Sequence, residues 1–143
     1  MIAAAPGRTG FERARDLVMR YGWNTTCFQI VNPGIEYWFG DDGRSVVGYV
    51  SNGKVRVVAG APVCRGEDLE QVTKDFESDA ASKNETVCYF GAEARLESVH
   101  RDSKDHSFVL LGAQPVWHPT EWPRIVSSQS SPGIRSVSRH GEM

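Results

Sequence analysis

The chain has 143 residues, of which 40% are hydrophobic and 24% are charged, and its formal net charge is −2. This length and composition are typical of a globular protein with one domain. The near-neutral charge offers no basic field for nucleic acid, so we expect no stable binding to DNA. No apolar run approaches the roughly 20 residues of a membrane helix, and the start of the chain lacks the features of a secretory signal. We therefore expect a cytoplasmic protein with no transmembrane segment, for which association with a membrane through a bound lipid stays open.

Three cysteines, Cys27, Cys64 and Cys88, lie far apart in the sequence. No C-x-x-C or Cys/His pair has the spacing of metal ligands, so we expect no metal site. All three lie in or beside apolar runs, where a free cysteine behaves as a small buried hydrophobic residue, and this favours a reducing compartment. Cys64 precedes a predicted helix N-terminus, which would favour a reactive thiolate, but no histidine or acid partner is evident for it.

The first predicted element is a helix from about Gly10 to Tyr21. Thr9 and Glu12 have the spacing of a capping box, and apolar residues then recur every three or four positions. Three runs rich in β-forming residues follow, at 25–31, 35–39 and 45–50, before the strand at 55–58. Turn signals separate them, the strongest being the hairpin signal Asn52-Gly53. These runs predict an antiparallel meander.

The stretch from 54 to 90 is the centre of the predicted fold. After the strand at 55–58 come the residues GAPV at 60–63, then an acidic helix and the returning strand TVCYF at 86–90. The apolar stripe of this helix consists of Leu69, Val72, Phe76 and Ala80. A strand, helix and strand of this length join two parallel strands.

The remainder predicts a short helix from Ala92 to Val99, a polar loop at 101–105 and a last strand from Ser107 to Gly112, continuing through 115–117. His100 and His106 flank the loop and are expected to be exposed. Residues 127–143 are rich in Ser, Gly and Pro and are expected to be disordered or aberrant, which leaves 1–126 as one domain. The predicted fold class is α/β (α+β), a mixed sheet with the order α-β-β-β-α-β-α-β.

That element order is the one found in GNAT-type acyltransferases. The strings EYWF at 36–39, GYV at 48–50, AGAPV at 59–63 and VLLGAQPVW at 109–117 resemble the phosphatidylglycerol lysyltransferase (lysyl-phosphatidylglycerol synthetase) C-terminal domain family. The resemblance covers residues 10–126. It implies a GNAT-like fold and the N-terminal half of an aminoacyl transferase built from two such halves. Such enzymes move an aminoacyl group from a charged tRNA onto a lipid headgroup or a similar acceptor.

The resemblance also implies that this chain is incomplete by itself. The family continues past residue 126 into an arginine-rich helix and a second half, whereas this sequence has Pro132-Gly133 and then ends. Two alternatives remain open. One is a non-catalytic binding module that dimerises through an exposed apolar patch near Trp117 and Trp122. The other is an acetyl-CoA-dependent N-acetyltransferase.

The loop at 62–68 argues against coenzyme A, because it has one glycine, a proline without an amide proton and two carboxylates that repel phosphate. We therefore expect no cofactor.

The sequence identifies no catalytic residue, but it suggests six candidates for substrate binding. They are Arg65, Glu93, Arg95, Trp117, His118 and Trp122. Arg65 would meet a phosphate or carboxylate, and Glu93 and Arg95 open the short helix beside the cleft of GNAT folds. The two tryptophans around His118 would line a pocket for an acyl or lipid group. Each has a structural alternative, namely a solvated arginine, a helix surface and a stiff connector.

Overall fold

The structure is a computed structural model that describes residues 9–112, 118–121, 123 and 124. The chain separates into two compact units, Met1–His106 and Ser107–Met143. The predicted tail at 127–143 and the expected apolar patch at Trp117 and Trp122 lie outside the described residues.

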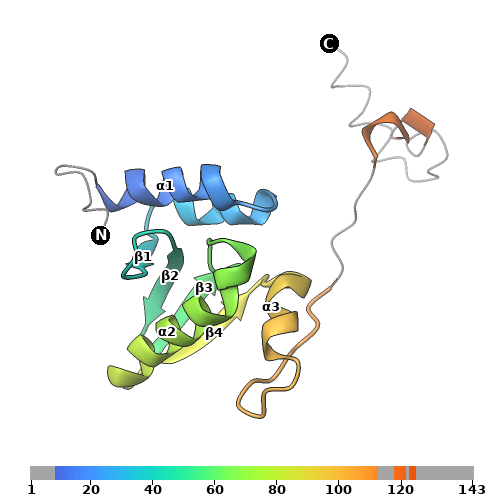
Figure 1. Ribbon diagram of the computed structural model, residues 1–143. Helices are drawn as coiled ribbons and strands as arrows, with labels where there is room; N and C mark the ends of the chain where they lie inside the picture. Colours follow the sequence, from blue (N-terminus) through green and yellow to red (C-terminus); the bar gives the residue numbers. More distant parts are fainter. Residues whose placement is uncertain (1–8, 113–117, 122, 125–143) are drawn as a thin grey trace. The chain divides into compact units, whose positions relative to one another are not determined.

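The first unit contains all the strands of the described residues (Figure 1). Its elements are, in chain order, α1 (Gly10–Tyr21), the 3-10 helix η1 (Thr25–Val31), β1 (Glu36–Phe39), β2 (Val46–Asn52), β3 (Val55–Ala59), the 3-10 helix η2 (Gly66–Asp68), α2 (Leu69–Ser82), β4 (Thr86–Phe90) and α3 (Glu93–His100). The second unit contributes the 3-10 helix η3 (Pro119–Glu121).

The four strands form one mixed sheet in the order β1-β2-β3-β4. β1 with β2 and β2 with β3 are antiparallel, and the pairing of Asn52 with Val55 closes the expected hairpin. β3 and β4 are parallel, with Val55 opposite Thr86 and Ala59 opposite Phe90. The predicted parallel crossover through α2 and the predicted mixed α/β fold class are therefore confirmed.

The helices begin where local sequence signals place them. The Thr9 hydroxyl accepts the Glu12 N–H at 3.2 Å, and the Glu12 carboxylate accepts the Thr9 N–H at 2.9 Å, so the capping box of α1 is present. All four residues of the apolar stripe predicted for α2 are buried. α3 begins one residue later than expected and runs to His100.

The strand predicted at 25–31 is wrong, because this segment forms the 3-10 helix η1. The side chain of Asn24 caps it by accepting the Cys27 N–H at 3.1 Å. Cys27 and Ile30 are the buried residues of the segment, and their separation of three positions matches one turn of a 3-10 helix and not the alternation of a strand. Capping and packing have thus overridden the β propensity of the run.

The last strand, predicted at 107–112, is also wrong for the residues described. The structure assigns no strand to residues 107–112, and the apolar side chains of this segment are exposed. The exposed fractions are 56% for Phe108, 78% for Val109, 92% for Leu110 and 70% for Leu111. A run of β-forming residues becomes a strand only when a neighbour exchanges backbone hydrogen bonds with it. Here the sheet ends at β4.

Two cores lie on opposite faces of the sheet, with α1 and α2 separated by the strands (Figure 1). Val46 and Val47 are neighbours in β2 and are both buried, and because a strand alternates its side chains they face opposite cores. Val46 packs with residues of α1 and η1, and Val47 packs with residues of α2, including Phe76. The first unit is therefore a sheet between two helical layers.

The edge strand β4 has one covered and one open face. Val87 and Tyr89 are half-buried and pack against the core beneath α2, whereas Cys88 is exposed and Phe90 is 62% exposed. The expectation that all three cysteines are buried is thus wrong for Cys88, because alternation along β4 turns its side chain away from α2. Cys27 and Cys64 are buried as expected.

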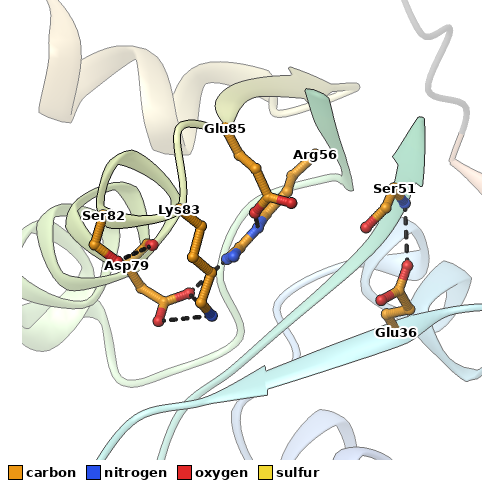
Figure 2. Close-up of polar contacts among 7 residues, drawn as sticks. All are labelled: Glu36, Ser51, Arg56, Asp79, Ser82, Lys83 and Glu85. Carbon is orange, nitrogen blue, oxygen red and sulfur yellow. Dashed lines mark hydrogen bonds and ion pairs between the residues drawn. The ribbon is translucent and has the colours of Figure 1, made fainter. Parts of the chain in front are cut away.

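An ion-pair network around Arg56 holds the crossover in register (Figure 2). The side chain of Arg56 lies under the end of α2 and is only 3% exposed. Its Nη1 donates to Oδ2 of Asp79 at 2.7 Å and its Nε donates to Oε2 of Glu85 at 2.6 Å. Burial lowers the pKa of Arg56, but the hydrogen bonds to Asp79 and Glu85 more than offset this and raise it above its ordinary value. One buried cation therefore ties β3 to α2 and to the residue before β4.

A close approach of η1 to β2 generates the first prediction, that Gly48→Ala destabilises the fold. A Cβ at position 48 would lie 2.5 Å from Cβ of Ile30 and 2.6 Å from its Cγ2. We expect the free energy of unfolding to fall by about 1–3 kcal/mol, measured by urea denaturation. Gly66→Ala is the matched control, because a Cβ there meets nothing within 4 Å. Equal stability of the two variants would contradict this packing.

The Arg56 network predicts a stability difference between the natural chain and Asp79→Asn that depends on pH. Burial raises the pKa of Asp79, but the hydrogen bonds from Arg56 and Lys83 outweigh this and lower it below 3.8. Because the pKa of Asp79 is lower in the folded than in the unfolded chain, its carboxylate stabilises the fold at pH values above the unfolded-state pKa. This stabilisation is lost as the pH falls through the folded-state pKa. We expect Asp79→Asn to cost about 1–2 kcal/mol at pH 7 and the difference to narrow below about pH 4.

Urea denaturation at a series of pH values measures this difference. The control is Asp75→Asn on the same helix, where the exposed carboxylate accepts one hydrogen bond from Gln71, and we expect a change below about 0.5 kcal/mol. A cost of Asp79→Asn that stays constant down to pH 3 would contradict the prediction.

Candidate functional site

The carboxyl ends of the parallel strands β3 and β4 form the edge where open α/β sheets bind ligands. The strands end side by side, and the N–H of Gly60 donates to the carbonyl of Phe90 at 2.8 Å. Gly60 and Gly91 turn the chain away from the sheet with φ values of 86° and 68°, a region that favours glycine. The segments that follow carry three of the six predicted site residues, Arg65, Glu93 and Arg95.

Glu93 is held by η1 and not left free for a substrate. Its Oε2 accepts from Nδ2 of Asn24 at 2.8 Å, and its Oε1 accepts from Oγ1 of Thr26 at 3.0 Å. Glu93 also has a φ of 57°, which is uncommon for a residue with a side chain. These contacts tie the start of α3 to η1.

Arg95 is likewise engaged within the fold. Its Nη2 donates to the carbonyl of Cys64 at 3.0 Å, and its guanidinium carbon lies 4.1 Å from the centre of the Trp23 ring. Its buried Nε has no hydrogen-bond partner among the described residues. Burial raises the pKa of the Cys64 thiol, which disfavours the thiolate that a nucleophile requires. The contacts of Arg95 and the burial of Cys64 support a structural role for these two residues.

Arg65 and His118 have local partners. Arg65 forms an ion pair with Glu67 and lies 3.8 Å, from Nε to Oδ2, from Asp68. His118 belongs to the second unit and is exposed there, with Nδ1 2.7 Å from the hydroxyl oxygen of Thr120. Trp117 and Trp122 lie outside the described residues. Within the first unit, the contacts described for Arg65, Glu93 and Arg95 have no partner in common.

A separate cluster, which the sequence analysis missed, joins Glu77 of α2, His100 at the end of α3 and His106 after the following loop. His100 is 6% exposed and His106 is half-buried, so the expectation that both are exposed is wrong. One potential ligand atom from each of the three side chains lies within 4.8 Å of the others.

The cluster is centred on one carboxylate oxygen. Oε1 of Glu77 lies 3.1 Å from Nε2 of His106 and 3.4 Å from Nε2 of His100. The two imidazole rings stack, with centroids 3.7 Å apart and planes at 19°. Burial and the neighbouring His106 lower the pKa of His100, while Glu77 raises it, and the net shift is downward. His100 therefore favours the neutral imidazole.

Two further side chains orient this cluster. The hydroxyl of Tyr89 donates to Oε1 of Glu77 at 3.0 Å, and burial together with the Glu77 carboxylate raises the pKa of Tyr89, so the phenol remains protonated. The hydroxyl oxygen of Ser103 lies 2.7 Å from Nδ1 of His106. A hydroxyl can donate or accept, so Ser103 serves either tautomer of His106. The only signal in the sequence was the pair of histidines flanking one polar loop.

An open hollow of about 310 Å³ lies beside the Arg56 network. It is lined by Trp38, Asp41, Asp75, Ser78 and Asp79. Its carboxylates make it acidic, which disfavours phosphate and other anions. None of the predicted site residues lines it.

Among the described residues, no helix is long and apolar enough to cross a membrane. No protein-family model and no curated protein matches the chain.

Two solved structures share the fold. The L-PGS of Bacillus licheniformis matches 64% of this chain with a TM-score of 0.56 and 21% identity. The C-terminal domain of a protein assigned as a lysylphosphatidylglycerol synthetase, from Agrobacterium fabrum, matches 65% with a TM-score of 0.57 and 22% identity. The match spans 28% of the first chain and 29% of the second. The resemblance inferred from the sequence is thus confirmed at the level of the fold, which is similar to part of these lysylphosphatidylglycerol synthetase structures.

Proposed function

We propose that this chain supplies the first, GNAT-like half of an aminoacyl-tRNA-dependent aminoacyl transferase that acts on a lipid headgroup or a similar acceptor. The observation that carries the proposal is the shared fold with two lysylphosphatidylglycerol synthetase structures over about two thirds of the chain. The sequence strings at 36–39, 48–50 and 59–63 support it independently, since they resemble the same family.

In this proposal the chain acts as a scaffold and requires a second half for transfer. The match spans less than a third of either solved structure. The contacts at the carboxyl edge of the sheet agree with this division, because Glu93 and Arg95 hold α3 to η1 and to the loop at Cys64. The groups that select charged tRNA and lipid would then come from the second half. The chain would work in the cytoplasm, where its free thiols stay reduced.

A split-protein assay tests the proposal. The full chain is mixed with the Bacillus licheniformis L-PGS from which the segment matching this chain has been deleted. The mixture receives lysyl-tRNA carrying labelled lysine and phosphatidylglycerol vesicles, and label extracted with the lipid is counted. We expect no labelled lipid from either protein alone and labelled lipid from the mixture.

The control is the same mixture with Gly48→Ala, which is expected to restore less transfer because its fold is weakened. A folded natural chain that restores nothing would contradict the proposal. Labelled lipid made by the chain alone would support its assignment as an aminoacyl transferase. It would refute the claim that the chain depends on a second half.

The second candidate, a non-catalytic module that dimerises, is favoured by the exposed apolar run at 108–111, whose side chains are 56–92% exposed. Exposed apolar runs of this kind mark interaction surfaces. This candidate predicts a dimer in analytical ultracentrifugation that dissociates on Val109→Ser with Leu111→Ser. A monomer at all concentrations removes it.

The third candidate, an acetyl-CoA-dependent N-acetyltransferase, requires binding of acetyl-CoA at the loop before α2. In the structure this loop ends in η2, where Glu67 and Asp68 surround the helix start and both contact Arg65. We expect no heat of binding in a calorimetric titration with acetyl-CoA. Saturable binding there would favour this candidate over the aminoacyl transferase.

A further inference from the structure

We infer that Glu77, His100 and His106 form a binding site for a divalent transition metal ion, with Zn²⁺ as the preferred ion. Two imidazole nitrogens and one carboxylate oxygen are a recurring zinc donor set with three protein ligands. Imidazole nitrogen disfavours Mg²⁺ and Ca²⁺, which prefer all-oxygen sites. This inference is independent of the proposed transferase function.

The distances place the three donor atoms together before any metal enters. Nε2 of His106 and Nε2 of His100 lie 3.1 Å and 3.4 Å from the same Oε1 of Glu77. Ligands about 2 Å from a tetrahedral zinc ion lie roughly 3.3 Å apart, which follows from the bond lengths of such sites. Small side-chain shifts would therefore bring all three onto one ion.

The second observation is that Nε2 of His100 has no hydrogen-bond partner among the described residues. Nε2 of His100 is buried, and its side chain is only 8% exposed. This nitrogen lies 3.4 Å from Oε1 of Glu77 but makes no hydrogen bond within the described part of the chain. A buried polar atom without a partner destabilises the fold. A metal ion at Nε2 would remove that defect, whereas a purely structural histidine would be expected to have a hydrogen-bond partner.

The surrounding groups match the outer shell of a metal site. Ligand histidines usually engage their second ring nitrogen in a hydrogen bond, which fixes the tautomer. Ser103 occupies that position at Nδ1 of His106, at 2.7 Å, and Tyr89 hydrogen-bonds to the Glu77 carboxylate at 3.0 Å. Three protein ligands leave one tetrahedral position for water, and the partial exposure of Glu77 and His106 would admit it.

The site would tie three segments together. Glu77 belongs to α2, His100 ends α3, and His106 follows the loop at 101–105. Metal binding would therefore anchor α3 and this loop to α2, and it would stabilise the native state because the unfolded chain does not hold the ligands together.

Zinc titration of the untagged full chain, first freed of metal by a chelator, tests the inference. We expect one Zn²⁺ per chain, a raised melting temperature, and with Co²⁺ the visible absorption of a tetrahedral site containing nitrogen ligands. Glu77→Gln keeps the size of the side chain and its hydrogen bond with Tyr89, and His106→Gln alters a partly exposed residue. Each is expected to lower the affinity more than about tenfold, and Ser103→Ala by about tenfold.

The controls exclude other histidines and thiols. His118→Gln changes an exposed histidine of the second unit, and Cys88→Ser changes the exposed thiol. Both should leave the affinity and stoichiometry unchanged. Folding of every variant is checked by circular dichroism, so that a loss of binding in a folded Glu77→Gln or His106→Gln protein supports the site.

Three results would overturn the inference. The first is the absence of saturable Zn²⁺ uptake by the folded natural chain. The second is unchanged affinity in both Glu77→Gln and His106→Gln. The third is loss of binding in Cys88→Ser alone, which would assign the metal to a thiol.

Discussion

The buried cation of Arg56 is the constraint on which the crossover depends. A parallel pair of strands needs a connection of about a dozen residues or more, and here that connection contains α2. Arg56 in β3 bonds to Asp79 near the end of α2 and to Glu85 just before β4. A buried arginine without its carboxylates would be costly, so the register that satisfies all three charges is strongly favoured. The strands then run side by side from Val55 and Thr86 onwards.

The same crossover explains why the two faces of the sheet differ. α2 covers the face to which Val47, Val58 and Tyr89 contribute, while α1 and η1 cover the other face beneath Val46 and Val63. The layer of α1 and η1 does not bury the face of β4 that points away from α2, where Phe90 is 62% exposed. An edge strand with an open apolar face is compatible with a domain that works beside another one, as the proposed half-transferase would.

The polar contacts at the start of α3 differ from those at its end. At the carboxyl edge of the parallel strands, Glu93 and Arg95 are engaged in holding α3 to η1 and to the loop at Cys64. At the other end of α3, Glu77 and the two histidines leave a buried nitrogen without a partner. Among the described residues, buried nitrogens without a hydrogen-bond partner therefore occur at both places, at Arg95 near the carboxyl edge and at His100 at the end of α3, but only the second lies beside two further metal-ligating side chains.

Local patterns in the sequence were sufficient for the elements whose partners are close in the chain. The capping box of Thr9 and Glu12, the turn at Asn52-Gly53 and the stripe of α2 each depend on residues a few positions apart, and each is present. The crossover was predictable as well, because strand, helix and strand follow one another within one short stretch of chain.

Tertiary contacts decided the rest. The run at 25–31 has β-forming residues, yet the cap from Asn24 and the burial of Cys27 and Ile30 make it helical. The run at 107–112 also has β-forming residues, yet the structure assigns no strand to it. The cluster of Glu77, His100 and His106 exists only because α2 and the end of α3 meet in space. The sequence by itself thus determined the elements whose signals are local, namely α1, the hairpin and the crossover through α2. Packing between distant segments determined which apolar runs become strands and which titratable groups meet, because those energies depend on neighbours that no local pattern contains.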